Sequence, residues 1–553
     1  MDRNRFISLL RQGILLGDGA TGTELTRRGM PVGACPELWA AEHPDAAQSL
    51  MADYARAGSQ FLTTPTFGGS AIKLARFGLA DRTEELNATL AKLTRQAAPE
   101  GVLVAANIGP SGELLQPMGT LGLDEMTEGF RRQAAGLLQG NPDFFLLETF
   151  MDPAEARAAV LAIRELCDLP FVVSCTLQNG RTLTGATPEA IAVLFTALGA
   201  AAVGCNCSGG PDTLRDAIAA MARHTNLPLF AKPNAGMPQV VNGRTVFDMK
   251  KDAFAEGMGR LIEAGATLVG GCCGTSPDYI ATLRQTLDGL SPARREPVDT
   301  LFLCSPRRVA AVDKTGPLCV VGAGIHPSGA DDLTEDLKGC HADVAVERAM
   351  DQMAAGVRAL AVNVAAPGVD EARAMDAVVN ELSVAVPLPL FISSADPDVL
   401  EAGLRPICGR SALGPVALGD DTDTKLASAH KYGAVAVLVP MENGQMPIDC
   451  AERVALAEQL LARAAAHGLD RQSLLIDVGD DSPVAVDFTR EMTQRGWHTI
   501  AGAAGQAWVQ STLSTDRLAE LAAAGLGAVL LHPTDEAMEA AEACEAIRGG
   551  NAG

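Results

Sequence analysis

A chain of 553 residues is too long for a single hydrophobic core and predicts two large domains or three small ones. Its net charge of −23 argues against nucleic acid and anionic membranes as partners, because phosphate binding needs a basic face. No stretch is long and apolar enough to span a bilayer, and the first residues lack the apolar run of a signal peptide, so we expect a cytoplasmic protein. Its thirteen cysteines are then expected to be reduced, and metal binding or burial must account for them.

Short apolar runs alternate with longer, alanine-rich amphipathic stretches over residues 1–290. Eight such units in succession predict a (β/α)8 barrel of the α/β class, with an open doubly wound sheet as the alternative. We expect the strands at residues 14–16, 60–64, 102–106, 144–147, 171–175, 201–204, 229–231 and 267–270.

Polar residues and cysteines follow these predicted strands. In a (β/α)8 barrel such positions line the C-terminal mouth, where active sites form. One polar residue at a strand end means little, whereas a set in register at successive strand ends indicates a site. The set is Asp18, Thr64, Thr66, Asn107, Glu148, Thr176, Asn206, Cys207, Lys232, Asn234, Cys272 and Cys273.

Two adjacent cysteines, Cys272 and Cys273, lie between glycines after the eighth strand. The glycines allow a tight turn in which both sulfurs converge on one point, whereas the alternative is two small buried apolar side chains. Cys207 follows the sixth strand, and strands six and eight both flank strand seven. Three thiolates with one open position describe a catalytic zinc site, with Zn–S bonds of about 2.3 Å. Cys205 competes for the role of Cys207, which we prefer because it lies nearer the mouth.

A zinc ion held by thiolates is a weak activator of water, because its ligands make it electron-rich. It still binds an incoming thiol and keeps it as a thiolate near neutral pH, where a free thiol of pKa about 8.5 is mostly protonated. The site therefore predicts sulfur as the nucleophile.

A competing motif precedes these cysteines in the chain. Residues 17–22 read Gly-Asp-Gly-Ala-Thr-Gly and match the dinucleotide-binding pattern G-x-G-x-x-G. Asp18 would place a carboxylate against the pyrophosphate, and no second strand follows at the usual distance. We interpret the match as accidental.

Several dispersed motifs resemble the zinc-dependent homocysteine S-methyltransferase domain over about residues 5–290. The resemblance implies that Cys207, Cys272 and Cys273 bind zinc and that the sulfur of homocysteine takes the remaining position. The motifs are Asp18-Gly19-Ala20-Thr21-Gly22-Thr23, Ile108-Gly109-Pro110-Ser111-Gly112, Leu147-Glu148-Thr149-Phe150, Asn206-Cys207, Lys232-Pro233-Asn234-Ala235-Gly236 and Gly271-Cys272-Cys273-Gly274-Thr275.

The same resemblance implies a binding site for the rest of the substrate. Asp18 and Glu148 are expected near the amino group of homocysteine, which needs an anionic partner. Asn234 is a hypothetical weak oxygen ligand that closes the zinc site before the substrate arrives. One departure is Pro65, where the family usually has asparagine, so an amide and an N–H are missing from the mouth.

Residues 291–317 contain several prolines and two arginine pairs and predict a linker. Beyond the linker the alternation resumes and predicts a second (β/α)8 barrel over residues 318–549. Its expected strands are residues 319–321, 359–364, 388–392, 415–418, 435–439, 474–476, 498–501 and 528–531.

Three motifs of the second barrel are Gly368-Val369-Asp370-Glu371, Lys431-Tyr432-Gly433-Ala434 and Leu475-Ile476-Asp477. In these motifs the barrel resembles the pterin-binding domain that follows the homocysteine domain in cobalamin-dependent methionine synthase. Its ligand motifs are degenerate, and each hydrogen bond lost to a buried pterin edge costs about 1–3 kcal/mol. We therefore expect no useful affinity for methyltetrahydrofolate. Asn363, Ser393 and Asp477 remain as candidate ligands, and a scaffold role is the alternative.

These observations predict transfer of a methyl group to the thiol of homocysteine, which gives methionine. The D-x-H-x-x-G pattern of a corrinoid module is absent, so the expected donor is methylcobalamin on a separate corrinoid protein. S-methylmethionine, betaine and methyltetrahydrofolate are alternative direct donors. A different class of function, a non-catalytic adaptor that binds a corrinoid protein, stays open.

Overall fold

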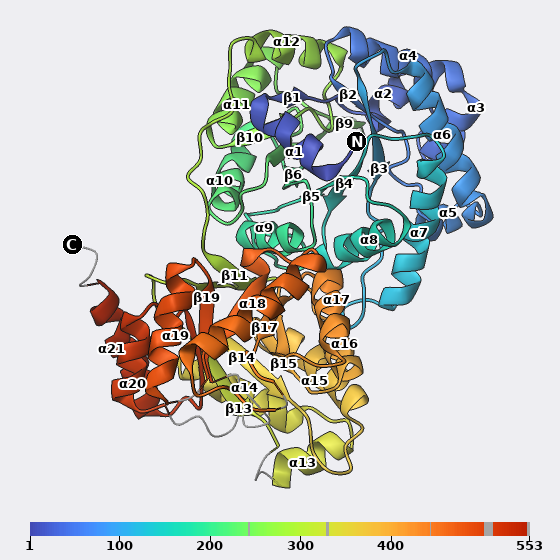
Figure 1. Cartoon of the computed structure of the whole chain (residues 1–553). Coiled ribbons are helices and arrows are strands. Elements are labelled where there is room, and N and C mark those ends of the chain that lie inside the picture. The colour runs from blue at the N-terminus through green and yellow to red at the C-terminus, as the bar shows by residue number, and fades with distance from the viewer. Residues whose placement is uncertain (242–243, 328–330, 443, 480, 503–512, 550–553) are drawn as a thin grey trace. The chain divides into compact units, whose positions relative to one another are not determined.

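The computed structural model describes residues 1–241, 244–327, 331–442, 444–479, 481–502 and 513–549. The chain forms two compact units, Met1–Val298 and Asp299–Gly553. In each unit, parallel strands alternate with helices that surround them (Figure 1). The predicted fold class, two tandem (β/α)8 barrels, is confirmed. Among the described residues, no helix combines the length and the apolar character needed to cross a bilayer.

The first unit contains an eight-stranded parallel sheet in the order β1-β10-β7-β6-β5-β4-β3-β2. Its two edges meet where Gln60 N–H donates to Leu16 O at 2.6 Å and Leu16 N–H donates to Gln60 Oε1 at 3.0 Å. The strands are β1 Leu15–Leu16, β2 Phe61–Thr63, β3 Leu103–Ile108, β4 Phe144–Phe150, β5 Phe171–Cys175, β6 Ala202–Asn206, β7 Leu229–Lys232 and β10 Ala266–Val269, with a small hairpin of β8 Gln239–Val241 and β9 Arg244–Val246.

The helices of the first unit follow the strands in the chain. They are α1 Arg3–Gln12, α2 Gly22–Arg27, α3 Pro36–Glu42, α4 Pro44–Arg56, α5 Ala71–Ala75, α6 Thr83–Ala97, α7 Leu123–Leu138, α8 Pro153–Leu166, α9 Pro188–Ala197, α10 Pro211–Ala222, α11 Lys251–Glu263 and α12 Pro277–Leu287. Helix α8 begins directly after β4, because Asp152 accepts a hydrogen bond from Ala154 N–H and Pro153 occupies the first turn.

All eight predicted strands of the first barrel are present, because strands covered on both faces appear in the sequence as short apolar runs. Strands β3, β4 and β6 extend further toward the mouth than predicted, so Asn107, Glu148 and Asn206 lie within strands. Close packing next to the site requires Gly204 in β6, where a Cβ atom would lie 1.8 Å from Phe230 O of β7.

The second unit is a closed barrel in the order β13 to β20, and all eight predicted strands are present. The weakest prediction, residues 415–418, corresponds to a strand that begins earlier, at Ala412. The start was not predicted because Gly414 and Pro415 interrupt the apolar run of this strand. The strands are β13 Cys319–Ile325, β14 Ala359–Asn363, β15 Leu390–Ser393, β16 Ala412–Val416, β17 Val435–Leu438, β18 Leu474–Asp477, β19 His498–Ala501 and β20 Ala528–Leu531. The helices are α13 Asp331–Lys338, α14 Asp343–Ala354, α15 Glu371–Ala385, α16 Pro397–Leu404, α17 Thr422–Tyr432, α18 Cys450–Ala466, α19 Pro483–Gln494, α20 Thr515–Ala523 and α21 Asp535–Gly549.

Part of the stretch predicted as a linker forms an antiparallel hairpin of β11 Leu301–Cys304 and β12 Val309–Val312. Leu301, Leu303 and Val312 are fully buried in one cluster with inward-facing residues of the second barrel. The side chain of Arg410 is buried beside the hairpin and donates to Phe302 O at 3.2 Å. The hairpin is therefore part of the core of the second unit.

Candidate metal and substrate site

Three cysteine sulfurs converge at the mouth of the first barrel. The ligand atoms of Cys207, Cys272 and Cys273 all lie within 4.8 Å of one another, and Cys207 Sγ is 3.7 Å from Cys273 Sγ. Thiolates around a tetrahedral zinc ion with bonds of about 2.3 Å have sulfurs about 3.8 Å apart. The donor set and its spacing therefore fit a zinc ion, and other clusters of this kind are not found among the residues with described positions.

The two cysteine-bearing loops are attached to the end of β7. Cys207 N–H donates to Lys232 O at 3.2 Å, and Cys272 N–H donates to Pro233 O at 2.8 Å. Cys273 N–H donates to the side-chain Oδ1 of Asn234 at 3.1 Å. The oxygen that the sequence suggests as a weak metal ligand therefore already orients the backbone of a cysteine, and its role as a ligand stays a prediction.

The glycines before the cysteine pair are required by close contacts. A Cβ atom on Gly270 would lie 2.8 Å from Asp18 O, and one on Gly271 would lie 2.4 Å from Thr275 Oγ1. Gly274 has a φ of +82°, in the left-handed region that favours glycine. These positions let the loop pack directly on the ends of β1 and β7.

The charge of the sulfur cluster is divided unequally. Interactions with Cys272 and Cys273, followed by burial, raise the pKa of the Cys207 thiol. Cys207 lowers the pKa of Cys272, but Cys273 and burial outweigh this effect and raise it to about 12. Interactions with Cys207 and then with Cys272 lower the pKa of the Cys273 thiol. A divalent cation bound to the three sulfurs would offset the charge of their thiolates.

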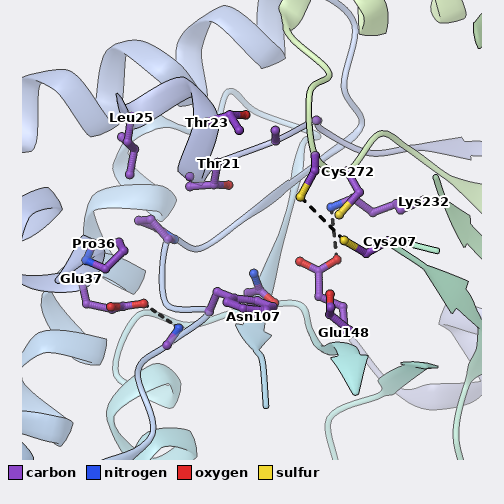
Figure 2. Close-up of a pocket in the computed structure, with 18 of the residues that line it drawn as sticks. Thr21, Thr23, Leu25, Pro36, Glu37, Asn107, Glu148, Cys207, Lys232 and Cys272 are labelled. Carbon is purple, nitrogen blue, oxygen red and sulfur yellow. Dashed lines mark hydrogen bonds and ion pairs between the residues drawn. The ribbon is translucent and has the colours of Figure 1, made fainter. Parts of the chain in front are cut away.

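Lys232 lies between two buried carboxylates beside the sulfurs. Its Nζ is 3.3 Å from Asp18 Oδ1. It is also 3.5 Å from Glu148 Oε2, beside the sulfurs (Figure 2). Burial opposes the charge of Lys232, but Glu148 and Asp18 outweigh it and raise the lysine pKa above its usual value. Burial raises the pKa of Glu148 to about 7, against the lowering effect of Lys232. Glu148 Oε2 is buried, and Lys232 is its charged partner.

The sulfurs line one end of a cavity of about 410 Å³. Figure 2 shows Cys207, Cys272, Lys232 and Glu148 grouped at one end, with Leu25, Pro36 and Glu37 at the other. This volume falls within the range of about 300–1,000 Å³ that is usual for small-molecule sites. Further lining residues include Pro65, Phe67, Lys73, Phe77 and Asn107.

Sequence reasoning does not identify the far end of this cavity. Glu37 is buried, and its Oε1 accepts a hydrogen bond from Gly68 N–H at 2.6 Å. Lys73 Nζ lies over the ring of Phe67, 4.9 Å from its centroid. These residues come from α3 and from the loop and helix after β2, and no pattern in the sequence singles them out.

Two residues that the sequence suggests for the site, Cys205 and Asp18, lie outside the sulfur cluster. Cys205 is fully buried and pairs in register with Cys175 of the neighbouring strand. Asp18 lines a separate small cavity, and its Oδ2 accepts hydrogen bonds from the N–H and hydroxyl of Thr63, both at 2.7 Å. The contact of Asp18 with a substrate amino group stays a prediction.

The candidate ligands of the second barrel are bonded to one another or to nearby backbone. Asn363 Nδ2 donates to Ser393 Oγ at 3.2 Å, and Asn363 Oδ1 accepts a hydrogen bond from Ala365 N–H at 2.9 Å. Asp477 Oδ1 accepts from Gly479 N–H at 3.0 Å. The strand ends thus bring Asn363 and Ser393 together.

The fold and the site together define a class of protein: a (β/α)8 barrel whose mouth carries three thiols suited to a thiophilic metal, followed by a second barrel. Residues 15–287 match the family model described as homocysteine S-methyltransferase, and residues 330–502 match the model described as pterin binding enzyme. The first barrel thus matches homocysteine S-methyltransferases and the second matches pterin-binding enzymes, which is the organisation of the N-terminal part of methionine synthase.

Known proteins similar to this chain include two methionine synthases. The enzyme of Mycobacterium tuberculosis (strain ATCC 25618 / H37Rv) is 27% identical over 502 residues, which cover 85% of this chain and 42% of that protein. The enzyme of Mycobacterium leprae (strain TN) is 26% identical, with the same shares covered. The chain thus spans about 42% of the length of these relatives. Among solved structures, the oxidized form of the homocysteine methyltransferase MmuM from Escherichia coli is 26% identical and covers 52% of this chain and 99% of its own, with a TM-score of 0.44.

Proposed function

We propose that the first barrel transfers a methyl group to the thiol of homocysteine and forms methionine, with zinc held by Cys207, Cys272 and Cys273. The observation that carries the proposal is the convergence of these three sulfurs beside a cavity of about 410 Å³. Bound zinc would lower the pKa of the substrate thiol and hold the sulfur as a thiolate near neutral pH.

The remaining residues of the site act on the rest of the substrate. The carboxylate of Glu148, which also pairs with Lys232, lines the same cavity and suits the ammonium group of homocysteine. Asp18 acts through Lys232, whose position between the two carboxylates it helps to fix. Asn234 holds the backbone of Cys273. Binding in this arrangement orients the sulfur toward the methyl group, which is the main contribution of positioning to catalysis.

The reaction balances as a nucleophilic displacement. The sulfur lone pair forms the new S–C bond, and the bond between the donor and the methyl carbon breaks with its electron pair left on the donor. The proton of the homocysteine thiol goes to solvent. We propose methylcobalamin on a separate corrinoid protein as the donor, with S-methylmethionine or betaine as the alternative.

All thirteen cysteines are free, which supports a reducing compartment, and we propose the cytoplasm.

Metal analysis and a matched pair of cysteine variants test the site. We expect about one zinc per chain, lost in Cys207→Ser and retained in Cys205→Ser, because Cys205 lies in β6, two residues before Cys207, and is outside the cluster. Methionine formation from labelled homocysteine, measured separately with a methylated corrinoid protein, S-methylmethionine and betaine, identifies the donor. Zinc retained in full by Cys207→Ser would contradict the assignment.

We propose further that the second barrel does not bind methyltetrahydrofolate with useful affinity. The internal hydrogen bonds of Asn363 and Ser393 support this proposal, because a pterin would have to replace them. Isothermal titration of the full chain with methyltetrahydrofolate is expected to show no binding at micromolar concentrations. A dissociation constant in the micromolar range or tighter would refute the proposal.

A further inference from the structure

Asn206, the last residue of β6, connects three strands at the mouth of the first barrel. Its side chain is fully buried, and its Oδ1 accepts hydrogen bonds from Thr149 N–H at 2.8 Å and from the Ser174 hydroxyl at 2.7 Å. Its Nδ2 donates to Thr149 Oγ1 at 2.7 Å and to Cys272 Sγ at 3.9 Å. One amide group thus contacts both the strand that carries Glu148 and a sulfur of the cysteine cluster.

Backbone strain is concentrated around this amide. Thr149, which follows Glu148, has a φ of +68°, and Cys207, which follows Asn206, has a φ of +54°. The left-handed region is strongly disfavoured for a β-branched residue, and a residue held in a sparsely populated region costs about 1–3 kcal/mol. Such strain persists only where surrounding contacts fix it, and Asn206 binds both the N–H and the hydroxyl of Thr149.

We propose that Asn206 is a positioning residue for the metal site: its amide donates a hydrogen bond to the Cys272 sulfur and fixes that sulfur relative to Glu148. This role rests on the proposed function of the cysteine cluster as a metal site. A thiolate accepts a hydrogen bond more strongly than a thiol, so the bond strengthens when a cation is bound. The bond also draws electron density from the sulfur, and hydrogen bonds to ligating sulfurs are one way in which proteins tune a metal centre.

An alternative is that Asn206 only connects strands. The bonds of its Oδ1 to Thr149 and Ser174 would be sufficient for that purpose. Asn206→Asp separates the two roles, because the carboxylate keeps an acceptor for Thr149 N–H and for Ser174, and the Thr149 hydroxyl can rotate to donate to the second oxygen. The bond to Thr149 is thus kept with its direction reversed, whereas the N–H that faces Cys272 is lost without replacement, and a negative oxygen then faces the sulfur.

The test measures the metal site in the full chain by two methods besides activity. Zinc affinity is measured by competition with a chromophoric chelator, and the thiolate-to-metal charge-transfer band is recorded after Co²⁺ substitution. For Asn206→Asp we expect zinc affinity to fall about 10- to 100-fold, the usual effect of losing an outer contact of a ligand. The band is expected to shift to lower energy, because the sulfur is more electron-rich without its hydrogen bond.

Thr149→Ser is the matched control, because it keeps the N–H and the hydroxyl that bind Asn206, and both readouts should stay at the wild-type values. If circular dichroism shows that Asn206→Asp is unfolded, Asn206→Ser is compared with Ser174→Ala, which removes a strand-connecting bond but keeps the N–H that faces Cys272. Loss of zinc affinity in Asn206→Ser but not in Ser174→Ala then supports the role of Asn206, and equal loss in both contradicts it. If the wild-type protein binds zinc and the folded variant matches it in zinc affinity and in spectrum, the role of Asn206 is overturned but the proposed metal site is not. A wild-type protein that binds neither metal overturns the proposed metal site and this role together.

Discussion

At the residue scale, Lys232 is the cation that compensates two buried carboxylates. Replacing it by methionine leaves Asp18 and Glu148 buried without a positive partner, and breaking a buried ion pair in this way costs about 3–5 kcal/mol. We expect Lys232→Met to lower the free energy of unfolding of the first unit by that amount, as measured by urea denaturation at pH 7. Without Lys232, the folded-state pKa of Glu148, already about 7 in the wild type, rises further above its unfolded value. Ionisation of Glu148 then opposes folding, so the loss of stability should grow with pH.

The exposed Lys251 provides a comparison for this variant, and Lys251→Met should change stability by less than about 0.5 kcal/mol. The double variant Lys232→Met/Asp18→Asn should recover part of the loss, since only one buried carboxylate then lacks its partner. A single variant at position 232 that stays within about 1 kcal/mol of the wild type would show that the ion pairs contribute little.

Strand-end positions in the sequence indicate which residues gather at the mouth, because a barrel places the C-terminal ends of all its strands on one face. They do not indicate how those residues pair. The ion pair of Lys232 with Asp18 joins residues 214 positions apart, and the bond of Asn206 to Cys272 joins residues 66 positions apart. Glu37 gives no periodic signal, because it lies in a short helix whose burial depends on the loop after β2.

At the element scale, β19 carries a buried histidine that should make the second unit sensitive to acid. His498 Nε2 lies 3.0 Å from Asp299 O, a carbonyl that only accepts, so this nitrogen carries the proton of the neutral ring. Nδ1 is buried without a hydrogen-bond partner in the described structure. Burial, and then Lys314, lower the pKa of His498 to about 4 from its usual 6.5. Protonation would bury a second N–H without an acceptor.

Because the folded pKa of His498 is below the unfolded one, its contribution to stability is fully present above about pH 6.5 and is lost as the pH falls toward 4. We expect a loss of about 2–3 kcal/mol between pH 7 and pH 4.5 from this residue. His498→Gln keeps a side-chain donor but does not titrate, so the difference between the two proteins in urea denaturation isolates the effect. Equal acid sensitivity of wild type and variant would contradict the assignment.

Among the other elements, the buried parallel strands are predictable and the hairpin is not. Runs such as residues 435–438 are apolar along their whole length because both faces are covered. The hairpin strands β11 and β12 lie among prolines and arginine pairs, and each has only four residues, so composition favours a linker. The hairpin strands are buried against residues of the second barrel, which come later in the chain, and no local pattern in the sequence reveals this contact.

At the scale of the whole molecule, the structure bears on where the second domain can be separated from the first. We propose that it begins at residue 299, because the hairpin buries Leu301, Leu303, Ala310 and Val312 in the barrel core. Each buried apolar side chain of this kind contributes about 1.5–3 kcal/mol, and alanine contributes less. Removing the hairpin should therefore cost on the order of 5–8 kcal/mol, which is comparable to the whole stability of a typical domain, about 5–15 kcal/mol.

We accordingly expect a fragment of residues 299–553 to be monodisperse and to unfold cooperatively, whereas a fragment of residues 318–553 should aggregate or melt without a cooperative transition. Deleting the hairpin also removes the backbone hydrogen bonds between Cys304 and Arg410, at 3.0 and 2.8 Å, and leaves the buried guanidinium without Phe302 O as an acceptor. Size-exclusion chromatography and thermal denaturation followed by circular dichroism distinguish the two fragments. Arg410→Met in the longer fragment tests the guanidinium separately, because it removes a buried charge while the hairpin stays in place. A fragment of residues 318–553 that melts cooperatively within a few degrees of the longer one would show that the hairpin only covers a barrel that is already stable.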